Sequence, residues 1–193
     1  MARHRLLAIF APVLLLLTAC GVNSIPTAEE EAKARWADVS VELQRRNDLI
    51  GNLVETVRGF ARQESDVLRE VTQARASASQ ISVTQDQLTD PAAMARLAEA
   101  QNRINISLQR LQEAYPELTS QRNFEALQVQ LEGTENRIGR ARERYNAAVQ
   151  NYNTTIRTFP AVIGARIIYG SQPMAPFEAP PEAQRAPQVN FSR

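Results

Sequence analysis

Residues 124–159 read FEALQVQLEGTENRIGRARERYNAAVQNYNTTIRTF. Large apolar or aromatic residues recur at every seventh position of this stretch, and smaller residues occupy most of the positions between them. The repeat consists of Phe124, Leu131, Ile138, Tyr145, Tyr152 and Phe159, with Leu127, Thr134, Ala141, Ala148 and Thr155 at the intermediate positions. Such a repeat predicts one long helix, over about residues 120–159, that supercoils left-handedly around a partner. A helix of about 36 residues is roughly 54 Å long, so its partners must be long as well.

A second long helix is predicted over about residues 27–61. Its apolar residues step by three and four from Trp36 to Phe60. Its start carries Pro26-Thr27 followed by three glutamates, which suit the positive end of the helix dipole. The two long helices therefore have similar lengths and can pack along each other.

Two shorter helices are predicted between the long ones. One ends near Gln80, and the other is opened by Asp90-Pro91 and ended by Pro116. The segment 77–89 between them is rich in Ser, Thr, Gln and Asp and is predicted to be the most mobile connection. No useful stretch alternates with period two, so the fold class is all-α. The expected architecture is an antiparallel up-and-down bundle of about four helices with coiled-coil-like packing.

The first 19 residues have the features of a secretory signal peptide. Arg3-His4-Arg5 precedes the apolar run Leu6–Leu17, and small residues lie just before Cys20. Leu17-Thr18-Ala19-Cys20 also resembles the bacterial lipobox, whose cysteine is acylated and becomes the first residue of the mature chain. The alternative is an uncleaved membrane helix over Leu6–Val22, at the short end of what crosses a bilayer. Both interpretations tether the domain to a membrane, and the lipid anchor places it outside the cytoplasm.

The predicted organisation has four parts. A signal peptide (1–19) and a lipidated lead (20–26) precede the helical bundle (27–160), and a Pro-rich tail (161–193) follows it. Because the tail holds many prolines and scattered apolar residues, it either packs along the bundle or is disordered.

The composition argues against a nucleic-acid partner and against most catalytic chemistry. The chain has 22 basic and 21 acidic residues, so it has no excess positive charge for nucleic acid. Its only histidine is His4, in the leader, and its only cysteine is Cys20. The mature chain lacks the side chains of Ser-His and Cys-His pairs and of most zinc, haem and iron–sulfur sites. We expect no catalytic residue, no metal and no cofactor. An enzyme that uses carboxylates alone, such as Glu55, Glu132 and Glu135, is the formal alternative.

Polar residues interrupt the apolar seams of both long helices. Arg46 lies on the seam of the first one, where it either pairs locally with Glu42 or makes an interhelical or ligand contact. In the last helix, Glu132 to Arg137 replaces large residues with small and polar ones, which indicates close helix packing or a lined cleft. The arginines of residues 137–144 form either a solvated face or a contact with lipid headgroups. The candidate interaction or polar-core residues are Arg46, Asp48, Asn52, Glu132, Thr134, Glu135, Asn136 and Arg137.

Three segments resemble the signature of the LemA family. The first is RRNDLIGNLVETV at residues 45–57, and the second is YPEL at residues 115–118 followed by NFEALQ. The most specific match is TENRIGRARERYNAAVQNYN at residues 134–153. The resemblance covers nearly all of the mature chain. It departs at Gly51, where the family usually has proline, and at Cys20, because a lipobox replaces the plain membrane helix of many members.

The resemblance implies a membrane-anchored, long helical bundle with no established enzymatic activity or cofactor. The leading hypothesis is a noncatalytic scaffold or protein-interaction module of the bacterial cell envelope, tethered through Cys20 to the cell membrane or the outer membrane. Gly21 after the cysteine favours the outer membrane in a cell with two membranes. The alternative is a small-ligand or lipid-binding module with a polar slot beside Arg46 and Thr134.

Overall fold

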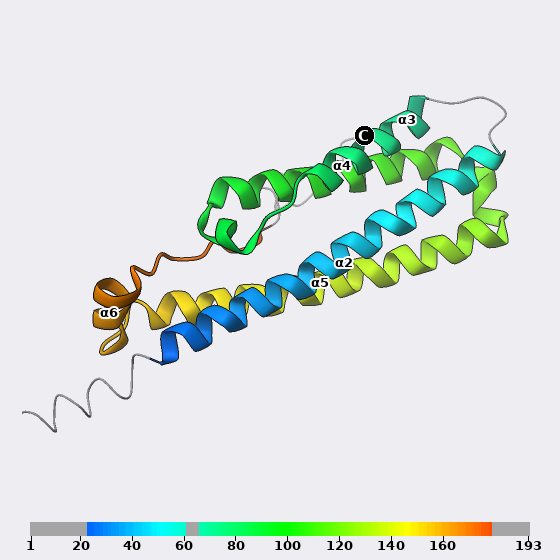
Figure 1. The fold of residues 1–193 in the computed structure, drawn as a ribbon. Helices are drawn as coiled ribbons and strands as arrows, with labels where there is room; N and C mark the ends of the chain where they lie inside the picture. Colours follow the sequence, from blue (N-terminus) through cyan, green and yellow to red (C-terminus); the bar gives the residue numbers. More distant parts are fainter. Residues whose placement is uncertain (1–22, 61–65, 179–193) are drawn as a thin grey trace, which may run out of the picture.

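The computed structural model describes residues 23–60 and 66–178 of the chain. The regular elements in these ranges are all helical (Figure 1). The two long helices are α2 (Ser24–Phe60) and α5 (Arg122–Thr155), and the two shorter ones are α3 (Asp66–Gln80) and α4 (Pro91–Ala114). Four short segments complete the set: η1 (Gln85–Thr89), η2 (Pro116–Ser120), α6 (Ala161–Gly164) and η3 (Ala165–Tyr169). The predicted all-α bundle with two long helices is confirmed.

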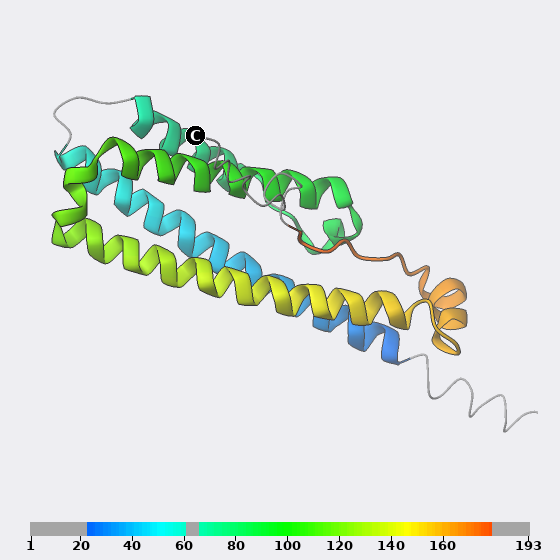
Figure 2. The same cartoon turned by 180° about the vertical axis from the view of Figure 1, so that it is seen from behind.

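The helices pack as two antiparallel pairs. α2 lies along α5 over most of its length, α3 lies along α4, and α2 also contacts α3. Figures 1 and 2 show the start of α2 beside the end of α5, at the end of the bundle where α6 lies. The chain therefore runs up and down the bundle, as the sequence predicts.

The core consists of two hydrophobic clusters, one toward each end of the bundle. The cluster at the α6 end includes Trp36 and Tyr145, whose ring centroids are 5.1 Å apart. The cluster at the other end includes Ile50 and Phe124, both fully buried. Arg46 precedes Ile50 by one helical turn, so it lies on α2 close to where the two clusters divide.

The seam of α5 is buried from Phe124 to Tyr152, but Phe159 is 71% exposed. The expected end of this helix near residue 159 is wrong, because α5 ends at Thr155. Pro160 has no N–H to donate to a carbonyl one turn earlier, and it disfavours helical dihedrals at the residue before it. The helix therefore ends before the proline, and Phe159 leaves the seam.

The other helix ends follow ordinary capping chemistry. α2 begins at Ser24 rather than near Thr27, since Pro26 falls in the first turn, where a missing N–H is tolerated. The Thr27 hydroxyl donates to the carbonyl of Asn23 over 2.8 Å. At the start of α4, Asp90 Oδ1 accepts from the N–H of Ala92 over 2.8 Å, as Asp90-Pro91 predicts.

The connection between α3 and α4 is held by buried apolar side chains, although its polar sequence predicts mobility. Val83 and Leu88 are buried, and Trp36 Nε1 donates to the carbonyl of Val83 over 2.9 Å. These contacts fix the connection against α2.

Within residues 23–60 and 66–178, no helix combines the length and the apolar character needed to span a bilayer. The proposed signal peptide, Cys20 and the tail beyond Glu178 lie outside the described residues.

Candidate functional site

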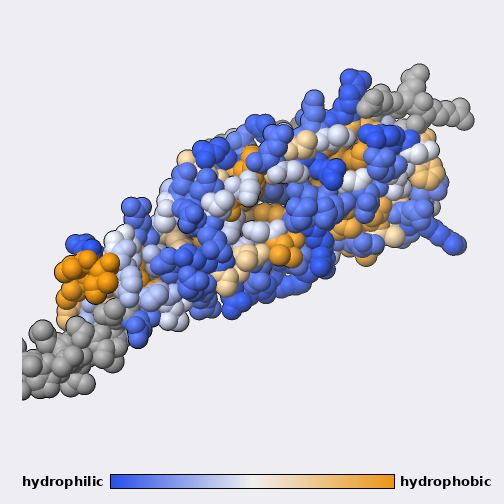
Figure 3. Space-filling view, viewed as in Figure 1, coloured by the Kyte–Doolittle hydropathy of each residue, from blue (hydrophilic) through white to orange (hydrophobic). Residues whose placement is uncertain are grey.

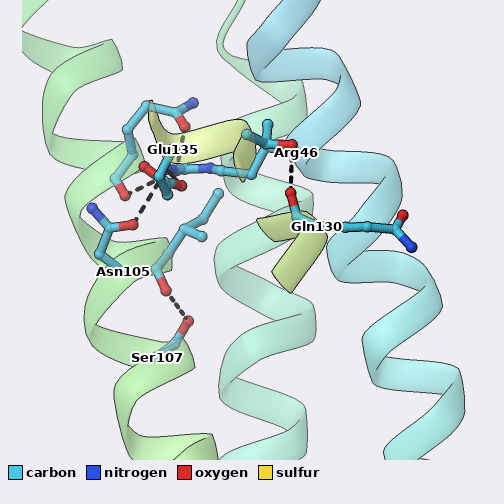
Figure 4. Close-up of polar contacts among 8 residues, drawn as sticks. Arg46, Asn105, Ser107, Gln130 and Glu135 are labelled. Carbon is cyan, nitrogen blue, oxygen red and sulfur yellow. Dashed lines mark hydrogen bonds and ion pairs between the residues drawn. The ribbon is translucent and has the colours of Figure 1, made fainter. Parts of the chain in front are cut away.

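Arg46 of α2 is the centre of a polar layer, which we define as Arg46, Gln101, Asn105 and Glu135. Arg46 and Gln101 are buried, Glu135 is partly exposed and Asn105 is exposed. Its Nη1 donates to Glu135 Oε1 over 2.6 Å and to Asn105 Oδ1 over 3.2 Å. Its Nη2 donates to Gln101 twice, to Oε1 over 2.5 Å and to the backbone carbonyl over 3.2 Å. Figure 4 shows the guanidinium of Arg46 directed toward Glu135 and Asn105. One side chain thus joins α2, α4 and α5.

The burial of Arg46 makes these partners necessary. The residue is 2% exposed, and a buried cation is tolerated only where a counterion and hydrogen-bond acceptors replace water. Glu135 supplies the negative charge and keeps 42% of its side chain exposed, so its own desolvation is small. Arg46 Nε is buried without a partner in the described structure.

A second bridge between α2 and α5 lies one turn away and consists of Glu42, Thr134 and Arg137. Arg137 Nε donates to Glu42 Oε2 over 3.0 Å, and its Nη2 donates to Thr134 Oγ1 over 2.7 Å. Thr134 is fully buried, and its hydroxyl donates to the carbonyl of Gln130 over 2.8 Å. Glu42 therefore pairs across the helices and not with Arg46, contrary to the local pairing that the i,i+4 spacing favours. The interhelical alternative for Arg46 is the one that the structure contains.

The other four predicted residues do not join these contacts. Asp48, Asn52, Glu132 and Asn136 are exposed. Asp48 Oδ1 accepts from Gln44 Nε2 over 3.0 Å on the surface of α2. The structure therefore brings together Arg46 with Glu135 and Thr134 with Arg137, and it leaves the remaining four at the surface.

A further polar contact places α3 against α2 at Gly51. Arg75 Nε donates to the carbonyl of Asn47 over 2.8 Å. A Cβ added at Gly51 would lie 2.9 Å from Arg75 Cζ, so the guanidinium occupies the space that a side chain would need. This explains in structural terms why glycine suits this position in a chain whose α3 carries Arg75.

Sequence reasoning missed a pair of asparagines that hold the tail segment, residues 170–178, along α5. Asn146 Oδ1 accepts from the N–H of Phe177 over 2.8 Å, and its Nδ2 donates to the Phe177 carbonyl over 3.2 Å. Asn153 makes the same two contacts with Met174, both at 2.9 Å. The two asparagines are seven residues apart on α5, about 10.5 Å of helix, which matches roughly three residues of extended chain. The signal was the Tyr-Asn dipeptide, which occurs twice with this spacing.

The tail segment also completes the core at the α6 end. Phe177 is buried with its ring centroid 5.9 Å from that of Trp36, and Arg142 Cζ lies 5.0 Å from the Phe177 centroid, in cation–π geometry. Tyr145 donates its hydroxyl to the carbonyl of Ala175 over 2.8 Å. Burial raises the pKa of Tyr145 above its ordinary value, and it raises the pKa of Tyr152 as well.

Two of the hollows on the bundle surface bear on the site. One, of about 290 Å³, adjoins the polar layer and is lined by residues that include Asn105, Glu132 and Glu135. The other, of about 500 Å³, lies between α3 and α4 and is lined by charged and apolar side chains, among them Glu70, Arg103 and Ile106. Among the described residues, no group of three or more His, Cys, Asp or Glu side chains is arranged to hold a metal ion.

These contacts define an elongated α-helical bundle with a polar layer around the buried Arg46. Two asparagines of α5 bind the tail segment through hydrogen bonds. A family model described as "LemA family" matches residues 35–191, which include the whole polar layer and the tail segment. The chain belongs to the LemA family.

Curated relatives are magnetosome proteins. The chain is 28% identical over 157 residues to Magnetosome protein MamQ of Magnetospirillum gryphiswaldense, covering 72% of this chain and 58% of that protein. It is 27% identical, over the same shares, to Magnetosome protein MamQ 2 and to Magnetosome protein MamQ 1 of Paramagnetospirillum magneticum. The chain thus spans 58% of the length of these relatives.

Proposed function

We propose that this protein is a lipid-anchored, noncatalytic scaffold or protein-interaction module of the bacterial cell envelope. Cys20 carries the anchor, the first 19 residues are the signal peptide, and the helical domain lies outside the cytoplasm at the cell membrane or the outer membrane. The family membership supports the bundle as the functional unit.

The observation that carries the proposal is the position of α2 relative to Cys20. The helix begins at Ser24, four residues after the cysteine. An extended chain covers at most about 3.6 Å per residue, so the start of the bundle lies within roughly 14 Å of an acylated Cys20. Such a short lead holds a rigid body at the membrane and not on a long flexible arm.

The polar layer supports a scaffold because its charges are used within the protein. Both terminal nitrogens of Arg46 are bonded to residues of α4 and α5, and Arg137 is bonded to Glu42 and Thr134. Groups committed to internal hydrogen bonds stiffen a bundle and fix its register. We assign this layer a structural role and place the contacts with a partner on the exposed helix faces.

Site-specific photo-crosslinking in cells tests the interaction role. A photoreactive residue is introduced at one exposed position of each helix: Val41 on α2, Gln73 on α3, Arg103 on α4 and Arg144 on α5. An interaction module gives a discrete crosslinked product from one or two adjoining faces and none from the others, and the product weakens in the Cys20→Ser chain. Absence of products from all four faces, or the same products from each, contradicts the proposal.

A small-ligand module is the second candidate, and the hollow beside Glu135 favours it. The hollow of about 290 Å³ is at the lower limit of ligand pockets, which begin at about 300 Å³. Native mass spectrometry of the purified full chain tests this candidate. A bound molecule that is lost in Glu132→Arg, with the helicity unchanged, supports the small-ligand module. A measured mass equal to that of the chain and its acyl groups alone rules the small-ligand module out.

A further inference from the structure

Exposed apolar side chains gather at one end of the bundle. We define the apolar tip as Phe159, Ile163, Ile167, Ile168 and Tyr169, whose exposed fractions range from 43% to 79%. The other large apolar side chains that are exposed in the described residues, namely Val41, Phe60, Ile106 and Val129, are spread over α2, α4 and α5. Figure 3 shows the tip as a continuous hydrophobic patch at the α6 end. Apolar clusters of this kind on a soluble surface mark interaction sites.

The small residues between the side chains of the tip pack against the core. α6 and η3 form one helical stretch, and its inward side is occupied by Ala161, Gly164 and Ala165, which are buried. Ala161 and Ala165 pack into the hydrophobic cluster of Trp36 and Tyr145. The large side chains are therefore exposed because the small ones fill the inner face, and not because the segment lacks contacts.

The apolar tip lies at the end of the bundle where the first long helix, α2, begins. Figures 1 and 2 both show α6 beside the start of α2. Since Ser24 follows Cys20 by four residues, an anchor at Cys20 brings this end, and no other, to the membrane surface. The far end of α2 is then about 55 Å away along the helix axis.

The charges around the tip suit a membrane surface. Arg157 and Arg166 are exposed beside the apolar side chains, and residues 156–177 contain no Asp or Glu. Tyr169 adds an amphipathic ring of the type enriched at bilayer interfaces. The acidic residues Glu30 and Glu31 lie near the start of α2. Attraction between the arginines and lipid headgroups is therefore not the main contribution to membrane binding. The apolar side chains carry the contact.

We propose that the apolar tip inserts into the interface of the lipid bilayer that holds Cys20, so that the bundle stands on the membrane in a fixed orientation. The inference rests on the proposed anchor and adds a second, independent contact to it. A single lipid attachment leaves a domain free to rotate, whereas an attachment and a nearby inserted helix together restrict it.

Fluorescence quenching of the mature, acylated protein in phosphatidylcholine vesicles with brominated acyl chains tests the inference. A tryptophan is introduced by Ile167→Trp at the tip, and the matched control is Val129→Trp on the exposed side of α5. The native Trp36 is buried and is common to both chains. Because interfacial helices bury their apolar face about 5–10 Å into the bilayer, we expect emission from the tip variant to fall about twofold relative to the control. Equal quenching in the two chains overturns the inference.

Two further measurements separate this result from the anchor and from misfolding. Adding Ile168→Ser and Ile163→Ser to the Ile167→Trp chain is expected to reduce the quenching, and because these side chains are exposed the helicity by circular dichroism is expected to stay the same. Acylation of Cys20 is measured separately by fatty-acid labelling. If Cys20 is labelled but the tryptophan at the tip is not quenched, the inference is overturned and the lipid anchor at Cys20 still stands. A quenched tip without labelling supports the insertion of the tip, but it overturns the lipoprotein and the fixed orientation that depends on the anchor.

Discussion

Arg46 of α2 and Glu135 of α5 form an ion pair with Nη1 and Oε1 2.6 Å apart, near the division between the two hydrophobic clusters of the bundle. The arginine is buried and the glutamate is half-exposed, so the positive charge, and not the negative one, depends on the protein for its solvation. Gln101 and Asn105 of α4 complete that solvation. Arg46 therefore links helices α2 and α5, through its ion pair with Glu135, to helix α4, through Gln101 and Asn105.

Gln101→Leu is expected to lower the free energy of unfolding by about 2–3 kcal/mol, because it removes one of the three side-chain acceptors of a buried cation. Chemical denaturation monitored by circular dichroism measures the loss. Gln109→Leu, an exposed position on the same helix, is the control and is expected to change little. Adding Arg46→Met to Gln101→Leu removes the unsolvated charge and recovers most of the loss. A double variant that is less stable than Gln101→Leu would contradict the conclusion that Gln101 stabilises the fold by solvating the buried charge of Arg46.

Asn146→Ala and Asn153→Ala are each expected to destabilise the fold by about 1–3 kcal/mol, because each leaves a backbone N–H and a carbonyl of the tail unpaired. Hydrogen exchange at the amides of Met174 and Phe177 measures the release of the tail directly. Asn151→Ala, on an exposed face of α5, is the matched control for the change in helix propensity alone. Unchanged exchange at the two tail amides would show that the asparagines do not hold the segment.

Gly51→Ala and Arg75→Ala are expected to be coupled. Alanine is better than glycine in a helix by about 1 kcal/mol, but the new methyl group requires the Arg75 guanidinium to move. Gly51→Ala therefore stabilises the Arg75→Ala chain more than it stabilises the original chain. A double-mutant cycle of unfolding free energies measures the difference, and strict additivity would contradict the close approach.

The fold is expected to lose stability at alkaline pH because of Tyr145. Burial raises the pKa of this phenol above its ordinary value of 10.0. Its stabilising contribution is complete while the phenol is neutral in both states, and it is lost as the pH rises above 10.0, where only the unfolded chain ionises. Denaturation at several pH values measures this loss, and Tyr145→Phe should remove much of it. Ionisation of Tyr145 in the folded chain at its ordinary pKa, seen by near-ultraviolet absorbance, would contradict the assignment.

The sequence predicts most of the fold because helix periodicity and helix ends are local signals. The seven-residue repeat from Phe124 to Tyr152 identifies the seam of α5, and Asp90 identifies the start of α4. The end of α5 was misplaced because the repeat continues formally to Phe159, whereas the backbone is limited by Pro160. The buried contacts of the connection between α3 and α4 could not be predicted, because the contact of Trp36 with Val83 joins it to α2, which is distant in sequence.

The candidate site is only partly predictable, because pairing between helices depends on register. Arg46 stands out as a charge at an apolar position, and its partners Gln101 and Asn105 do not, since polar residues on α4 are frequent. The spacing of Glu42 and Arg46 suggests a local ion pair, but Glu42 accepts a hydrogen bond from Arg137 of α5 instead. Asn146 and Asn153 are marked in the sequence by the repeated Tyr-Asn dipeptide, but the residues of the tail that they bind, Phe177 and Met174, are evident only in the structure.

Labelling of growing cells with an alkyne fatty acid tests the central claim most directly, because it reports acylation of this chain without any assumption about a partner. The full-length protein is compared with Cys20→Ser, both are purified from the membrane fraction, and the attached alkyne is detected by coupling to a dye. The account predicts a strong label on the original chain and none on the variant. Equal labelling of the two chains, or no labelling of either, would contradict the lipid anchor on which the proposed function depends.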